Sequence, residues 1–336
     1  MDKITVIISH YSPVENQGYY QGILMDNVRI ISSQISRDNL EIIICDDGSK
    51  WSSSLTSNNG IYILKNIQDT SNKFLKNLNC DLYLRYPSGR YYKNSLLKNT
   101  AINMAKFENI LILDDDTMLN KNAIKKYLKY LKDYDYVKGR VVKYWKIPHT
   151  YFSNEVQGTN YAIKKYLYIK TGGFSEYLYD DSWGEDDEIN WLIYKTIKYE
   201  SKNNNNNGGC YAGDIIGKDI ESGRWKIGDK MGNPDERWEN FRQNFINIHG
   251  LSPNNNDSRK KWKWLTIPSL SAFIYEIFYL SIRIFFATIN FKFKKGIPKI
   301  VKKVIINLYQ FLPVFIKNWY RRKIRLKNFA KSLMKL

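Results

Sequence analysis

An apolar run that ends in three consecutive aspartates constrains the fold of this chain more than any other segment. Glu108–Asn120 reads ENILILDDDTMLN, in which four apolar residues precede Asp114, Asp115 and Asp116. A short apolar run of this kind is typical of a strand that is buried on both faces. The three carboxylates then follow the carboxyl end of the strand, where ligands bind in open α/β sheets.

Three adjacent carboxylates repel one another unless a positive group joins them. Two carboxylates at positions i and i+2, such as Asp114 and Asp116, can both turn toward one hard cation, because such cations prefer oxygen ligands. A solvated acidic turn is the alternative interpretation. The segments before and after the triplet favour the metal site.

Strand-like and helix-like segments alternate along the first part of the chain. Lys3–Ser9 and Glu41–Cys45 are continuous apolar strands, and Gly22–Ser36 between them has helical spacing. Two parallel strands joined by a helix form a right-handed βαβ unit. Further strands are expected at 61–64, 136–144 and 158–163, and further helices at 93–106, 123–131, 164–171, 189–197 and 235–248. The pattern predicts an α/β domain with a mainly parallel sheet flanked by helices.

The composition indicates a folded chain in a reducing compartment. Its 336 residues allow one large domain or two smaller ones, and 43% of them are hydrophobic. Cys45, Cys80 and Cys210 are far apart and have no metal-ligand spacing, so no disulfide framework is expected. The first apolar run is too short for a signal peptide. We therefore expect the active part to face the cytoplasm.

The net charge of +19 is concentrated near one end of the chain. Residues 258–336 contain 19 Lys and Arg and one acid, Glu276, whereas residues 1–257 contain 33 Lys and Arg and 32 acids. We therefore predict a near-neutral domain at 1–257 and a basic amphipathic helical region at 258–336. The predicted linker between them is Ser252–Ser258 (SPNNNDS).

The basic region is expected to bind an anionic membrane surface. Leu270–Phe291 is long enough to cross a bilayer, but the charges of Glu276 and Arg283 near its middle favour a helix that lies in the interface. Each Lys or Arg near an anionic leaflet contributes about 1 kcal/mol. Nucleic-acid binding is the competing interpretation, but the long apolar runs between the charges favour lipid. We expect peripheral attachment to the inner face of the membrane and no nucleic-acid partner.

Four segments, taken in order, resemble an inverting family-2 glycosyltransferase of the GT-A fold. They are ITVIIS, EIIICDDGS, LKNTAINMAKFENILILDDDTML and GGFSEYLYDDSWGEDDEINWL, and together they cover roughly residues 3–192. The WGEDDE part is also similar to galactosyltransferases and chondroitin-type polymerases. The resemblance implies a GT-A-like, Rossmann-like sheet for the first domain.

The resemblance also implies a donor site and a metal site at the strand ends. Asp114 and Asp116 would hold Mn²⁺ or Mg²⁺, and Asp229 would be the third ligand because Lys226–Asn233 contains no histidine. His249 comes later in the chain and is expected to be structural or exposed. The residues expected to contact the donor are Ser9, Tyr11, Asp46, Asp47, Lys98, Asn99, Asp114 and Asp115. An ordinary type I turn is the alternative explanation for the two aspartates of the second strand.

The acidic segment near residue 186 is expected to serve the acceptor. Asp186 would be the base that takes the proton of the acceptor hydroxyl, and Glu185, Asp187 and Trp183 would bind the acceptor. Acids at a helix N-terminus that only complement its dipole, at about 0.3–1 kcal/mol each, are the alternative. Four consecutive acids exceed that need. For Trp183, an ordinary place in the core is the alternative to a sugar platform.

The expected activity is the transfer of a hexose or hexosamine from a UDP-linked donor to a hydroxyl of a glycan or lipid-linked glycan at the cytoplasmic membrane face. A nucleotidyltransferase also uses paired aspartates and a metal, but it more often has a Gly-rich basic loop after the first strand, which HYSPVENQG is not. An inactive membrane-bound glycan-binding scaffold is the non-enzymatic alternative. The sequence leaves the donor sugar, the linkage and the oligomeric state open.

Overall fold

The computed structural model describes residues 2–12, 17–57, 60–87, 94–143, 159–176, 185–203, 208–220, 234–250 and 263–266. The chain divides into two compact units, and all of these residues lie in the first unit, residues 1–144 and 149–269. The second unit, residues 145–148 and 270–336, lies outside the described residues. Most of the predicted basic region therefore stays a prediction, as does the domain boundary after Asp257.

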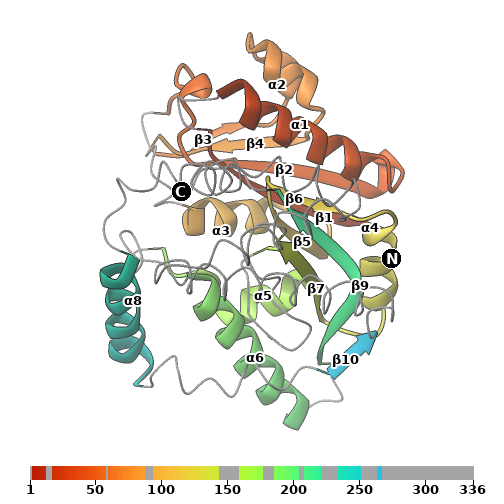
Figure 1. Cartoon of the computed structure of the whole chain (residues 1–336), viewed down its shortest axis with the longest axis vertical. Coiled ribbons are helices and arrows are strands. Elements are labelled where there is room, and N and C mark those ends of the chain that lie inside the picture. The colour runs from red at the N-terminus through yellow and green to blue at the C-terminus, as the bar shows by residue number, and fades with distance from the viewer. Residues whose placement is uncertain are drawn as a thin grey trace, which may run out of the picture. The chain divides into compact units, whose positions relative to one another are not determined.

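The expected α/β architecture, a large sheet flanked by helices, is confirmed (Figure 1). The strands are β1 (Ile4–His10), β2 (Leu40–Asp46), β3 (Tyr62–Leu64), β4 (Leu82–Arg85), β5 (Asn109–Asp114), β6 (Thr117–Leu119), β7 (Tyr136–Lys143), β8 (Tyr161–Lys164), β9 (Gly209–Asp219) and β10 (Lys263–Thr266). The α-helices are α1 (Gln17–Ser32), α2 (Lys73–Leu78), α3 (Asn94–Met104), α4 (Ala123–Tyr130), α5 (Lys165–Thr171), α6 (Glu185–Asn203) and α8 (Pro234–His249).

The strands form one mixed sheet in the order β10-β9-β7-β8-β5-β1-β2-β4-β3, and β6 pairs with β9. Its centre, β5-β1-β2-β4, is parallel, as the sequence predicts. The expected βαβ unit consists of β1, α1 and β2. Antiparallel strands interrupt this pattern, because β8 lies between β5 and β7 and runs opposite to both.

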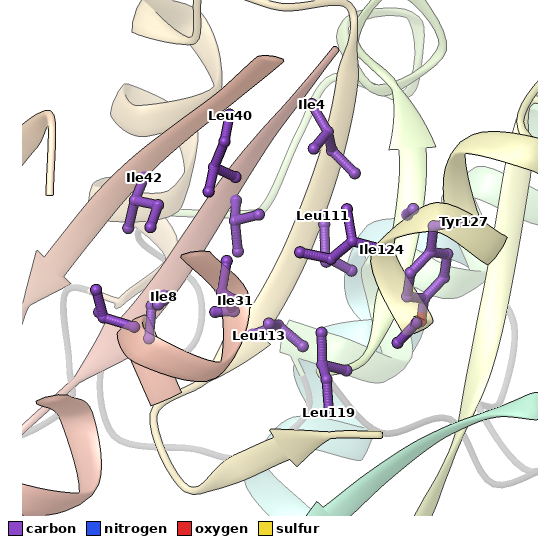
Figure 2. Packing of buried hydrophobic residues seen from close by; sticks show 14 of the residues in the cluster. Ile4, Ile8, Ile31, Leu40, Ile42, Leu111, Leu113, Leu119, Ile124 and Tyr127 are labelled. Atoms are coloured by element: carbon purple, nitrogen blue, oxygen red, sulfur yellow. The ribbon is translucent and has the colours of Figure 1, made fainter. Parts of the chain in front are cut away.

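Each central strand is buried on both faces because its side chains alternate between two apolar layers. On one face the strands pack against α1, α2 and α4, and on the other against α3, α5 and α6. Figure 2 shows part of the first layer, with Ile4, Ile8, Leu40, Ile42, Leu111 and Leu113 of the strands beside Ile31 of α1 and Ile124 and Tyr127 of α4. The continuous apolar runs seen in the sequence are thus explained by burial on both faces.

The strand β10 differs from the helix expected after residue 257. Residues 263–266 pair in parallel with β9, with Lys263 opposite Cys210. The edge of β9 offers unpaired backbone groups, and these favour an added strand over a helix at this place. Within the described ranges, no helix has the length and apolar character needed to cross a membrane.

All three cysteines are free and buried, in line with the absence of a disulfide framework. Cys45 lies in β2, Cys80 lies between α2 and β4, and Cys210 lies in β9. Burial raises the pKa of the Cys80 and Cys210 thiols to about 12 and that of Cys45 still further. The thiols are therefore protonated at neutral pH.

Candidate functional site

The polar ends of β1, β2 and β5 lie side by side at one edge of the sheet, as the sequence predicts. Ser9 of β1 is in register with Cys45 of β2 and with Asp114 of β5, and His10 is in register with Asp46. Parallel strands place their carboxyl ends together, and no insertion disturbs this register. The acidic segments after β2 and β5 therefore flank the end of β1.

The three aspartates after β5 have different surroundings. Asp115 is buried, and its Oδ2 lies 2.5 Å from Nδ1 of His10. Asp114 and Asp116 are only half-buried. The pairing with His10 occupies the middle carboxylate and leaves its two neighbours as the candidates for a cation. One buried carboxylate with a half-buried carboxylate on either side leaves an i, i+2 pair of the kind that can share one cation.

One buried side chain, Asn27 of α1, holds the backbone of this acidic turn. Its Nδ2 lies 3.3 Å from the carbonyl oxygen of Asp114, 3.1 Å from that of Asp115 and 3.2 Å from that of Thr117. The amide of Asp115 also donates to the carbonyl of Ser9 at 3.0 Å. The shape of the turn is thus fixed by contacts with α1 and β1.

The carboxylate oxygens of the acidic turn are suitable ligands for a hard divalent cation. Mg²⁺ is commonly held by one or two carboxylates together with substrate phosphates and water, and Asp114 with Asp116 would supply the two carboxylates. In the part of the chain that the structure describes, no group of three or more His, Cys, Asp or Glu side chains is placed to hold a metal. Asp229, the predicted third ligand, lies outside the described residues.

Asp46 is buried and accepts hydrogen bonds from within the protein. Its Oδ1 accepts from the backbone amide of Ser49 at 2.9 Å, and its Oδ2 accepts from the hydroxyls of Ser52 and Tyr83. The neighbouring Asp47 is also buried, and its amide donates to the carbonyl of His10 at 3.0 Å. Asp46 thus closes a side-chain turn onto Ser49, in which Gly48 has a φ of +81° and the backbone is therefore not that of a type I turn. Contact of these aspartates with a nucleotide stays a prediction.

Two further residues that the sequence predicts to contact the sugar donor lie at the end of β1. Ser9 is buried, and its hydroxyl has no hydrogen-bond partner among the described residues. Tyr11 is half-buried and follows the strand directly. Both positions suit contact with a ligand at this edge, and their roles stay predictions.

Asp186, the expected base, lies in the first turn of α6 and faces Lys98 of α3. Oδ1 of Asp186 lies 3.7 Å from Nζ of Lys98, whose side chain is 2% exposed. The aspartate side chain is 35% exposed. Asp186 is therefore reachable from solvent while one of its oxygens is directed at a buried cation.

Lys138 of β7 is a site residue that the sequence reasoning missed. It is 3% exposed, and its Nζ donates to the carbonyl of Thr159 at 2.8 Å. Burial lowers the pKa of Lys138 to about 7, although the charges of Asp186 and Asp114 raise it. The available signal was a lysine that directly follows the apolar residues Tyr136 and Val137 at the start of a predicted strand.

Tyr161 of β8 and Thr159 connect this lysine to both acidic segments. Burial raises the pKa of the Tyr161 hydroxyl, and the charges of Asp186 and Asp114 raise it further. The backbone amide of Asp114 donates to Oγ1 of Thr159 at 2.7 Å. The end of β5 and the start of α6, which are far apart in the sequence, therefore meet around Lys138 and Tyr161.

Asn99 of α3 braces the turn after α5. Its Oδ1 accepts from the amide of Phe174 at 3.0 Å and from the Tyr168 hydroxyl at 2.5 Å, and its Nδ2 donates to the Phe174 carbonyl at 2.9 Å. A Cβ on Gly173, which has a φ of +79°, would lie 2.8 Å from that Oδ1. Asn99 thus anchors the segment before the acidic stretch, and its predicted contact with the donor stays a prediction.

The remaining acceptor candidates are only partly described. Glu185 and Asp187 lie in α6 with side chains outside the described part, and Trp183 lies outside the described residues. Glu188, which is buried, has its Oε1 2.8 Å from Nε2 of His249 on α8. His249 therefore has the structural role that the sequence suggested, since it joins α8 to the start of α6.

Comparisons with known proteins give similarities in structure only. No family model matches the chain, and no curated protein matches it in sequence. The chain is similar to the mannosyltransferase PcManGT from Pyrobaculum calidifontis in complex with GDP-Man and Mn²⁺, with a TM-score of 0.47 and 16% identity over 75% of this chain and 66% of that one.

Two structures of S. aureus TarS are also similar. One has a TM-score of 0.44 and 12% identity, over 75% of this chain and 44% of that one. TarS 1-349 in complex with UDP-GlcNAc has a TM-score of 0.45 and 12% identity, over 77% of this chain and 76% of that one. The chain thus spans less than half of the longer TarS structure and about two thirds of the mannosyltransferase.

Proposed function

We propose that the chain is a metal-dependent inverting glycosyltransferase that moves a sugar from a nucleotide-sugar to a hydroxyl group. One observation carries the proposal. The negative charges of Asp114 at the end of β5 and of Asp186 at the start of α6 both raise the pKa values of the buried side chains of Lys138 and Tyr161. A carboxylate pair suited to a cation and a separate, partly exposed carboxylate thus converge on one place. Such a transfer needs both.

The two acidic segments have different tasks in this reaction. Asp186 takes the proton of the acceptor hydroxyl as its oxygen attacks the anomeric carbon from the side opposite the diphosphate. The bond between that carbon and the diphosphate oxygen breaks, and its electron pair stays on the nucleoside diphosphate. Asp114 and Asp116 would hold Mn²⁺ or Mg²⁺, which would stabilise the charge on the departing diphosphate.

The proposed donor is a UDP-linked hexose or hexosamine, and the proposed acceptor is a glycan or a lipid-linked glycan. The resemblance of the WGEDDE segment supports a sugar acceptor. The basic composition of residues 258–336 supports attachment to an anionic membrane surface on the cytoplasmic side. A lipid-linked acceptor would account for that attachment.

Release of the nucleotide from a panel of UDP-, GDP- and CMP-sugars tests the proposed activity. We expect one donor to release its nucleoside diphosphate (for CMP-sugars, CMP) in the presence of Mn²⁺ and an oligosaccharide mixture, and chelation to stop the release. Asp114→Ala and Asp116→Ala should each lower the rate by about 100-fold or more, because a bound cation contributes several kcal/mol. Asp133→Ala, at an exposed acid on the surface, is the matched control.

Calorimetry with UDP and GDP separates the alternatives when no donor reacts. A chain that binds neither nucleotide in the presence of Mn²⁺ is not a transferase that uses UDP- or GDP-sugars. Release of pyrophosphate from a nucleoside triphosphate would instead identify a nucleotidyltransferase.

Cosedimentation of the full chain with lipid vesicles tests the membrane proposal. We expect the chain to pellet with vesicles that contain anionic lipid and to stay in the supernatant with neutral vesicles. High salt should weaken the binding, because it screens the attraction. Equal binding to both kinds of vesicle would contradict an electrostatic attachment.

A further inference from the structure

Two buried lysines from different elements surround the candidate base. Lys98 comes from α3, Lys138 comes from β7, and Asp186 lies in the first turn of α6. Nζ of Lys98 is 3.7 Å from Oδ1 of Asp186, and Asp186 has the largest effect among the charges that act on Lys138. The two ammonium groups therefore act on the same carboxylate.

Burial of an ammonium group is costly unless partners compensate for the lost water. One hydrogen bond of the Lys138 ammonium group goes to a neutral carbonyl, that of Thr159. Lys98 lies over the ring of Phe174 at 4.8 Å, a cation–π contact. Neither of these contacts neutralises a charge, whereas the carboxylate of Asp186 brings negative charge to both lysines, and that of Asp114 to Lys138.

The carboxylate of Asp186 presents its two oxygens differently. Oδ1 is buried and has no hydrogen-bond partner among the described residues, although the side chain as a whole is 35% exposed. The exposure therefore comes from the other atoms of the side chain, which include Oδ2. The neighbouring Tyr161 hydroxyl is likewise buried and without a hydrogen-bond partner in the described part. The interaction of Oδ1 of Asp186 with the described residues is therefore electrostatic attraction to lysine and not a hydrogen bond.

We propose that Lys98 and Lys138 are positioning residues that hold Asp186 by its inner oxygen, Oδ1, so that Oδ2 faces the acceptor hydroxyl. This inference rests on the proposed function and assigns the two lysines to the base instead of the donor. Two cations from separate elements fix both the position and the rotation of one carboxylate. Fixed orientation of a reacting group is a large part of catalysis, and a 1 Å displacement can cost about 100-fold in rate.

The test compares Lys98→Met and Lys138→Met with the wild-type chain in the same transfer assay. We expect each variant to lower kcat by about 10–100-fold, while the donor KM and the affinity for UDP with Mn²⁺ stay within about 3-fold of the wild-type values. The stoichiometry of UDP binding counts the folded sites, so a loss of folded protein is not mistaken for a loss of kcat.

Lys165→Met is the matched control for loss of a partly buried lysine. Its Nζ donates to the carbonyls of Asn103 and Ala105 at 2.9 and 2.8 Å, so its partners among the described residues are backbone carbonyls. We expect this variant to keep the wild-type kcat. A second comparison adds Lys98→Met to Asp186→Asn, where the residual donor hydrolysis should not fall further because the carboxylate has already been removed.

Three results would overturn the inference. A raised donor KM or weaker UDP binding in the lysine variants would assign the lysines to the donor. An unchanged kcat would remove them from the reaction, and a further loss on the Asp186→Asn background would show that they act elsewhere. These outcomes differ from failure of the proposed function, in which the wild-type chain itself neither binds UDP or GDP nor transfers a sugar.

Discussion

Replacement of Lys138 by methionine should change how the stability of the protein depends on pH. The ammonium group is buried at 3% exposure, and its pKa falls from the ordinary 10.5 to about 7. Unfolding restores the ordinary pKa, so above pH 7 the unfolded chain binds more protons than the folded one. The free energy of unfolding therefore rises with pH in this range. Between pH 7 and pH 9 the two pKa values give a rise of about 2 kcal/mol.

Methionine has a similar length and no charge, so the variant lacks this rise. We expect the difference in unfolding free energy between Lys138→Met and the wild type to fall by about 2 kcal/mol from pH 7 to pH 9. Subtraction of the two curves removes the contributions of groups that both proteins share. The buried thiols and tyrosines, whose pKa values are raised, affect stability mainly above this range because their unfolded forms ionise at about pH 9–10.

Urea denaturation followed by circular dichroism, at one-unit steps from pH 6 to pH 9 with a chelator present, measures this difference. Lys165→Met serves as the control, and its difference from the wild type should stay constant. A constant difference for Lys138→Met as well would show that the lysine titrates as it does in water. That result would contradict the structural conclusion that Lys138 is buried between the two acidic segments.

Two further substitutions test the supports of the site. Asn27→Ala should lower the free energy of unfolding by about 2–4 kcal/mol, because carbonyls of the acidic turn lose their hydrogen-bond donor. It should also weaken Mn²⁺-dependent UDP binding. Exposed Asn103→Ala is the control, and equal urea midpoints for the two variants would contradict the role of Asn27 in holding the turn. Gly139→Ala should cost about 1–3 kcal/mol, because its Cβ would lie 2.4 Å from Oη of Tyr127. Gly22→Ala has open space around its Cβ within α1 and should instead stabilise by about 0.5–1 kcal/mol.

The central strands and their polar ends could be predicted because their signals are local. Continuous apolar runs such as Ile110–Leu113 identify strands that are buried on both faces, and the residue that follows each run marks the edge where a site can form. The strand β9 was missed, because its glycines and aspartates do not match a strand pattern. The antiparallel placement of β8 depends on pairing partners that a short segment does not specify.

The contacts that distinguish one acid from another could not be predicted, because they are tertiary. His10 and Asp115 are separated by 105 residues, and the separation of Asn27 from the acidic turn is similar. The sequence predicted Asp114 and Asp116 as metal ligands and Asp115 as a contact of the donor, whereas the fold pairs Asp115 with a histidine. Lys138 was overlooked for the same reason, since only the folded chain brings the charges of β5 and α6 to it.

The three buried cysteines provide the protein with built-in reporters of local opening. A thiol reagent needs the thiolate, and burial suppresses that form in the closed structure. The modification rate of each cysteine in the native protein therefore measures how often its surroundings open. Cys45 lies in a central strand with a neighbour on each side, whereas Cys210 lies in β9 beside the short β10 and Cys80 lies before β4. We expect Cys80 and Cys210 to react before Cys45, so that mass spectrometry of the unaltered chain would reveal which end of the sheet opens first.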